Sequence, residues 1–130
     1  MARRSVILVQ TEDESMAQLL PAILTALPDI ELVMVQTAAQ AAEYLRNHRP
    51  DLVMLDLDWP HVFDLPTIMN LAHRTLETIR AGDDGNLPPT IGLSSELARC
   101  QMLDLGLTEG IRKPFDVFDF ETKVEHALGR

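Results

Sequence analysis

The chain has 130 residues, of which 46% are apolar, and this suits one domain with a single hydrophobic core. Twenty acidic residues against eleven basic ones give a formal net charge of -9, which argues against both a nucleic-acid surface and an anionic membrane as partners. The single cysteine excludes an internal disulfide, and the absence of a signal-peptide core or a long apolar run predicts a cytoplasmic protein.

The first half of the chain alternates short apolar runs with helical periodicity. Residues 6–9 form a β-branched run that predicts a buried strand. Residues 16–27 carry apolar side chains at steps of three and four, which predicts a helix, and residues 30–35 predict the second strand. Thr37 begins the next helix, because Gln40 stands three residues later as in a capping box.

The middle of the chain contains the most buried predicted strand and the longest loops. Residues 52–55 form an apolar run that predicts the third strand, and a loop of residues 56–64 follows it. Apolar positions at helical spacing predict a helix over residues 65–79. Glycine, aspartate and proline then predict a surface loop over residues 81–89.

The last third repeats the alternation. Residues 90–93 predict the fourth strand, and Ser95 is placed to cap a helix over residues 96–105. Residues 109–112 give the fifth strand, which has the weakest pattern, and residues 117–128 give the last helix. Five strands that alternate with five helices are typical of a parallel sheet with helices on both faces, so residues 1–130 are expected to form one α/β domain.

Polar side chains follow the predicted strands at the edge of the sheet where such folds bind ligands. Asp56 and Asp58 follow the third strand, Ser94 follows the fourth and Lys113 follows the fifth. Close carboxylates are stabilised by a hard cation such as Mg²⁺, and a lysine adds a second positive charge. A carboxylate can attack phosphorus to form an acyl phosphate, whose oxygens a serine and a lysine can bind. The set indicates phosphoryl transfer to Asp56.

Three motifs resemble the response-regulator receiver domain of two-component signalling, and the resemblance covers essentially the whole chain. DLVMLDLDWP resembles the phosphoacceptor strand with Asp56 in the phosphorylated position, and PTIGLSS places Ser94 at the family's Ser/Thr. GIRKPF places Lys113 at the family's lysine, whose bond to proline is commonly cis. The resemblance implies a flavodoxin-like (βα)5 three-layer sandwich with a parallel sheet of order 2-1-3-4-5.

The metal-binding acids of this family are incomplete. The family usually carries two acids directly after the first strand, where an ungapped alignment puts Thr11 and Glu12. The resemblance then implies a weakened Mg²⁺ site formed by Glu12, Asp56 and the backbone carbonyl of Asp58. Asp13 is the alternative ligand if the loop is displaced by one residue.

Two further departures concern switching. The family often has an aromatic residue three positions before the lysine, which turns inward on phosphorylation, and this chain has Gly110. The segment PHVFDLP is longer and bulkier than the family's turn, and the side chain of Asp58 is expected to be free to add negative charge near the site.

The resemblance implies a phosphoacceptor domain rather than an enzyme. A histidine kinase or phosphotransfer protein would phosphorylate Asp56 with Mg²⁺, and this would switch a surface for a downstream protein, an effector domain or a homodimer through the fourth helix, fifth strand and fifth helix. The alternative is a phosphorylation-independent pseudo-receiver that serves as a docking or dimerisation module. A weaker alternative is a phosphatase-like enzyme with Asp56 as nucleophile and Asp58 as general acid.

Overall fold

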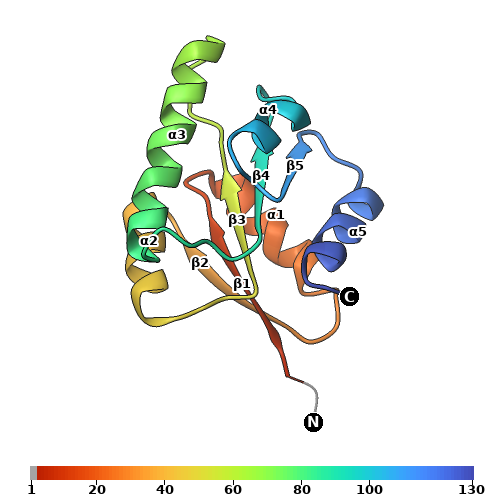
Figure 1. Cartoon of the computed structure of the whole chain (residues 1–130). Coiled ribbons are helices and arrows are strands. Elements are labelled where there is room, and N and C mark those ends of the chain that lie inside the picture. The colour runs from red at the N-terminus through yellow and green to blue at the C-terminus, as the bar shows by residue number, and fades with distance from the viewer. Residues whose placement is uncertain (1–2) are drawn as a thin grey trace.

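The protein forms a five-stranded parallel sheet of order β2-β1-β3-β4-β5, with helices on both faces (Figure 1). The computed structural model describes residues 3–130. The strands in this range are β1 (Ser5–Gln10), β2 (Ile30–Val35), β3 (Leu52–Asp56), β4 (Thr90–Ser94) and β5 (Glu109–Arg112). The helices in this range are α1 (Glu14–Leu24), α2 (Ala38–Asn47), α3 (Leu65–Gly82), α4 (Arg99–Asp104) and α5 (Val117–Ala127). The predicted fold class and strand order are therefore confirmed.

Successive side chains of the central strands point to opposite faces of the sheet and form two separate cores. Ile7 and Val9 of β1 belong to the core that α1 and α5 cover. Leu8 belongs to the core that α2, α3 and α4 cover. Because both faces are buried, the strands carry continuous apolar runs rather than alternating patterns. This packing holds the ends of β1, β3, β4 and β5 close together on one edge, at the top of Figure 1.

Side-chain caps fix the starts of the longer helices. Asp13 accepts hydrogen bonds from the first backbone N–H groups of α1, and Asp64 and Asp116 do the same for α3 and α5. The predicted capping box of α2 is present, with Thr37 and Gln40 bonded to each other's backbone. Within residues 3–130, no helix is both long enough and apolar enough to span a bilayer.

The fourth helix differs from its prediction. A helix was expected over residues 96–105 with Ser95 as its cap, but α4 begins only at Arg99. The preceding residues form bends because their backbone N–H groups bond to the side chains of Ser94 and Asp58 instead of to helical carbonyls. The predicted strands and the other helices agree with the structure to within three residues at each end. The Lys113–Pro114 peptide bond is cis, as the resemblance implied.

Candidate functional site

Asp56 ends β3 with its side chain held by two donors. Its Oδ1 accepts a hydrogen bond from Lys113 Nζ at 2.7 Å, and its Oδ2 accepts one from Thr11 Oγ1 at 2.7 Å. Asp56 is only 7% exposed. The charge of this carboxylate is thus balanced by an ammonium and a hydroxyl of the same chain, and the predicted contact of Asp56 with Lys113 is present.

Lys113 is shared between two carboxylates. Its Nζ lies 2.7 Å from Asp56 Oδ1 and 3.0 Å from Asp58 Oδ2. Burial by itself lowers the pKa of Lys113, but the hydrogen bond and charge of Asp56, followed by those of Asp58, outweigh it and leave the pKa above its ordinary value. Lys113 therefore remains charged at neutral pH and joins the ends of β3 and β5.

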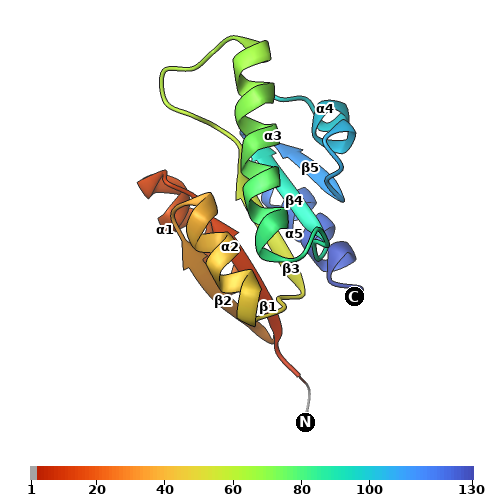
Figure 2. The ribbon, with the colours of Figure 1, turned by 60° about the vertical axis from the view of Figure 1, so that its left-hand side comes forward.

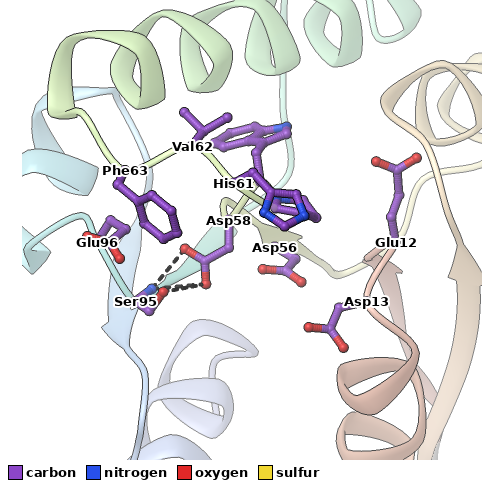
Figure 3. Close-up of a pocket in the computed structure, with 11 residues that line it drawn as sticks. Glu12, Asp13, Asp56, Asp58, His61, Val62, Phe63, Ser95 and Glu96 are labelled. Carbon is purple, nitrogen blue, oxygen red and sulfur yellow. Dashed lines mark hydrogen bonds between the residues drawn. The ribbon is translucent and has the colours of Figure 1, made fainter.

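Thr11, rather than Glu12, is the residue after β1 that reaches Asp56. β1 extends to Gln10, which pairs with Leu55, so the next residue along the strand lies beside Asp56. Thr11 is buried there, whereas Glu12 is exposed and its side chain extends away from Asp56 (Figure 3). The position of Glu12 as a direct metal ligand is therefore not supported. An alignment shifted by one residue would have placed Gln10 and Thr11 at the acid pair.

Gln10 is a buried polar residue that the sequence analysis did not single out. Its Nε2 donates a hydrogen bond to the carbonyl of Gln36, while its Oε1 is buried and has no hydrogen-bond partner among the described residues. Glutamine supplies an amide where the family would have a carboxylate. The end of β1 consequently brings no negative charge to Asp56.

The side chain of Asp58 is fully engaged, contrary to the expectation that it would be free. Its oxygens accept hydrogen bonds from Ser95 N at 2.9 Å and Ser95 Oγ at 3.0 Å (Figure 3). They also accept one from Ser94 Oγ at 3.0 Å and contact Lys113. Burial raises the pKa of Asp58, but the hydrogen bonds of Ser95, Lys113 and Ser94 outweigh it and hold the pKa below its ordinary value.

The two serines exchange the roles that the sequence suggested. Ser94 is fully buried. Its Oγ accepts hydrogen bonds from the backbone N–H groups of Glu96 and Leu97, which is the hydrogen-bond pattern of a helix cap. Ser95, which was expected to be the cap, lines the cavity next to Asp56 and donates its hydroxyl to Asp58. The predicted contact of Ser94 with a phosphoryl group on Asp56 stays a prediction.

The strands behind these serines pack closely against α4. Gly92 of β4 pairs with Gly110 of β5, and Met102 of α4 lies over both. A Cβ atom on Gly110 would come within 2.8 Å of Met102 Cβ. The missing aromatic residue is thus replaced by a methionine that fills the space from the helix side.

A cavity of about 550 Å³ opens beside Asp56. Carboxylates of Glu12, Asp13, Asp56, Asp58 and Glu96 lie along it, and the loop between β3 and α3 adds an apolar wall that includes Trp59, Val62 and Phe63. This loop swings out from the sheet in Figure 2. Phe63 is 74% exposed, so the bulky loop widens the cavity without closing it.

The predicted Mg²⁺ site has Asp56 at its centre, and Thr11 stands beside it where the resemblance implies an acid. Mg²⁺ requires several oxygen ligands in octahedral geometry. Asp56 and Asp58 are bonded to donors of the chain, and Asp13 Oδ1 accepts from the backbone of Ser15 and Met16. Between residues 3 and 130 no group of three histidine, cysteine, aspartate or glutamate side chains could hold a metal ion. The predicted ligands Glu12, Asp13, Asp56 and Asp58 line one cavity, and Mg²⁺ binding there stays a prediction.

Solved structures similar to this chain include receiver domains and response regulators, although no family model matches the chain. The receiver domain of a sensor histidine kinase from Pseudomonas aeruginosa, with a magnesium ion coordinated in its active-site cleft, is 21% identical with a TM-score of 0.76, over 98% of this chain and 99% of that one. A two-component response regulator from Clostridium difficile is 18% identical with a TM-score of 0.74, over 98% of each chain.

A third similar structure is a chemotaxis response regulator of Vibrio cholerae. It is 15% identical with a TM-score of 0.72, and the match covers 95% of this chain and 98% of that one. Identities at this level establish a shared fold. The fold of this chain is that of receiver domains, and its chemistry has to be argued from its own residues.

Proposed function

We propose that this chain is a two-component signalling domain of the pseudo-receiver kind, which docks to other proteins without Mg²⁺-dependent phosphorylation of Asp56. The observation that carries the proposal is Thr11, whose hydroxyl lies 2.7 Å from Asp56 where the resemblance places an acidic metal ligand. A hydroxyl donor stabilises the ionised carboxylate but cannot neutralise an incoming phosphoryl group. Its partners would be a histidine kinase, a phosphotransfer protein or a downstream protein in the cytoplasm.

Exposed apolar side chains support a docking role. Val117 and Phe118 begin α5 with 48% and 76% of their surface exposed. The resemblance assigns partner or homodimer contacts to α4, β5 and α5. A nucleic-acid contact is not part of the proposal, since the chain carries a net charge of -9.

The second candidate is the phosphoacceptor domain, and the contact of Lys113 with Asp56 favours it. An ammonium 2.7 Å from the carboxylate could offset charge on a phosphoryl group, and the adjacent cavity leaves room for a donor. The phosphatase-like alternative is weaker, because hydrogen bonds lower the pKa of Asp58 and keep this residue ionised instead of able to give a proton.

Intact-mass spectrometry distinguishes these functions. The protein is incubated with Mg²⁺ and a small acyl-phosphate donor, with Asp56→Ala as the control. The pseudo-receiver predicts no phosphoryl adduct and no Mg²⁺-dependent change in the fluorescence of Trp59. An adduct that Asp56→Ala abolishes would overturn the proposal in favour of the phosphoacceptor, and steady release of phosphate from esters would favour the enzyme.

A genetic comparison tests docking directly. An allele with Asp56→Asn should behave as wild type, whereas Phe118→Ser, which leaves the core intact because the side chain is 76% exposed, should resemble a deletion. If Asp56→Asn behaves as the deletion and Phe118→Ser as wild type, docking independent of Asp56 is wrong.

A further inference from the structure

The carboxylate of Asp58 occupies a point where donors from two other segments converge. Ser94 Oγ, Ser95 N and Ser95 Oγ come from the end of β4 and the loop after it, and Lys113 Nζ comes from the end of β5. The four distances lie between 2.9 and 3.0 Å. A backbone N–H, two hydroxyls and an ammonium together form an anion-binding site.

These donors include the two that were expected to hold a phosphoryl group on Asp56. Ser94 and Lys113 were assigned to phosphoryl oxygens, and here both bond to Asp58. Lys113 reaches Asp56 and Asp58 with the same Nζ, so the two carboxylates are adjacent. An anion bound to this set does not have to be a phosphoryl group, because a carboxylate offers similar acceptor oxygens.

We infer that Asp58 is a built-in anion that fills this site permanently and thereby holds the loop of residues 95–98 against the sheet. The inference rests on the proposed function, since a domain that is not phosphorylated needs another anion to order this loop. Asp58 acts here as a positioning residue, and the ligand class of the site is a carboxylate or phosphate anion.

The position of the loop is transmitted to the surface of α4 and β5. Arg112 of β5 donates a hydrogen bond to the carbonyl of Ser95 at 3.0 Å. Arg99, the first residue of α4, forms an ion pair with Glu109 of β5 at 2.5 Å. Met102 then packs α4 onto Gly110. Arg112 therefore links the loop that Asp58 holds to β5, and the contacts of Arg99 and Met102 join α4 to the same strand.

Removal of the carboxylate should create an empty anion site that an added anion can refill. In Asp58→Ala, we expect hydrogen exchange at the backbone amide of Ser95 to become faster by about tenfold or more, because its hydrogen bond to the carboxylate is lost. The amides of Glu96 and Leu97 should follow, because they bond to Ser94 Oγ, which loses its own bond to Asp58. Acetate or inorganic phosphate, titrated into Asp58→Ala, should slow this exchange again in a saturable manner, while the amides of β1 and β3 should not change.

Two further variants keep the test decisive. Asp58→Asn retains the shape of the side chain, should fold if Asp58→Ala does not, and should show faster exchange that no anion reverses, because the amide still fills the site. Asp64→Ala removes another aspartate of the same loop, one that bonds to Thr67, and should leave Ser95 unaffected. Unchanged exchange in both Asp58 variants, or exchange in Asp58→Ala that no anion slows, would overturn the inference.

The outcome of the hydrogen-exchange experiment does not depend on the result of the intact-mass experiment. A phosphoryl adduct on the wild-type protein, together with exchange in Asp58→Ala that an added anion slows, would overturn the proposed function and still support the anion site. No phosphoryl adduct, together with exchange in Asp58→Ala that no anion slows, would overturn the role of Asp58 and still support the pseudo-receiver.

Discussion

The two sides of the edge that carries Asp56 are built in opposite ways. On the side of β4, β5 and α4, Ser94, Ser95 and Lys113 are bonded to Asp58, and α4 packs onto a pair of glycines. On the side of β1 and α1, Thr11 contacts Asp56, while Glu12 is exposed and Asp13 caps its own helix. The first side is tightly ordered and the second is an open acidic rim.

The contrast shows which side of this edge is held by hydrogen bonds and ion pairs between segments. A metal-dependent site would need an acid in contact with Asp56 on the β1 side, where Thr11 stands instead. The charge balance comes instead from Lys113, which lies on the ordered side and serves both carboxylates. Ser94 and Lys113, which were expected to bind a phosphoryl group, thus bond to Asp58 of the same domain. Variants that weaken the ordered side, or that add charge to the open side, test this difference.

The largest effect is expected for Lys113→Met. Asp56 would lose the ammonium that balances it while its side chain is only 4% exposed, and Asp58 would lose the same partner. Removal of one partner from a buried ion pair costs about 3–5 kcal/mol, and the value here should lie at the lower end because Lys113 is 15% exposed. Urea denaturation at pH 7 measures the loss.

The matched control is Lys123→Met. Lys123 pairs with Asp119 on the surface of α5, and loss of such a pair costs about 0.2–1 kcal/mol. The cost of Lys113→Met should also shrink as the pH falls, because protonated carboxyl groups no longer require the cation. Equal losses for the two lysine variants would mean that Lys113 is not the ion that holds this edge together.

The next effect is expected for Gly110→Ala. The new Cβ atom would lie 2.8 Å from Met102 Cβ, which is too close and involves an atom that cannot move without the helix. Overpacking of this kind costs about 1–3 kcal/mol. Thermal or urea unfolding measures it. In the double variant with Met102→Gly the Cβ atom of residue 102 is absent and the clash disappears, so the double variant should be no less stable than Met102→Gly alone. Additive losses would contradict the close packing of α4 on β5.

Much of this architecture could be predicted from the sequence, because it depends on periodicity. The apolar runs that alternate with helical segments predicted the parallel sheet. Because the ends of its strands converge at one edge, Lys113 was correctly predicted to lie next to Asp56. The start of α2 followed from Thr37 and Gln40 alone. These features are local or topological, and they do not require knowledge of side-chain direction.

The features that were missed depend on single-residue register and on tertiary contacts. β1 extends one residue past the end of its apolar run, and this decides that Thr11 and not Glu12 faces Asp56. The exchange of roles between Ser94 and Ser95 depends on the bends that Asp58 imposes, which no pattern in the sequence encodes. The late start of α4 has the same cause.

A smaller effect is expected for Thr11→Asp, which adds charge to the open side. A carboxylate next to Asp56 would be repelled by it, and we expect a loss of about 1 kcal/mol without metal. The same pair of carboxylates could bind Mg²⁺, so the variant should gain about 1.4 kcal/mol when Mg²⁺ is tenfold above its dissociation constant. Thermal unfolding with and without Mg²⁺ measures both changes.

Glu12→Asp is the control for Thr11→Asp, because it alters an acid that is already exposed and should create no response to Mg²⁺. The wild-type protein should not respond either. If Mg²⁺ stabilises the wild-type protein as much as Thr11→Asp, the open side binds a cation without an acid at position 11, and the contrast between the two sides fails.

The smallest effect concerns the pH dependence of Asp58. Its pKa is below the ordinary 3.8 in the folded protein, so the stabilisation from its ionised form is fully present above the unfolded-state pKa and is lost as the pH falls through the folded-state pKa. The difference in unfolding free energy between the wild-type protein and Asp58→Asn should therefore be constant above about pH 5 and shrink below about pH 4. Glu12→Gln, on the open side, should change the stability by less than about 0.5 kcal/mol throughout. A difference for Asp58→Asn that grows on acidification would mean that the donors around Asp58 favour its neutral form, and the ordered side would then not be held by an anion.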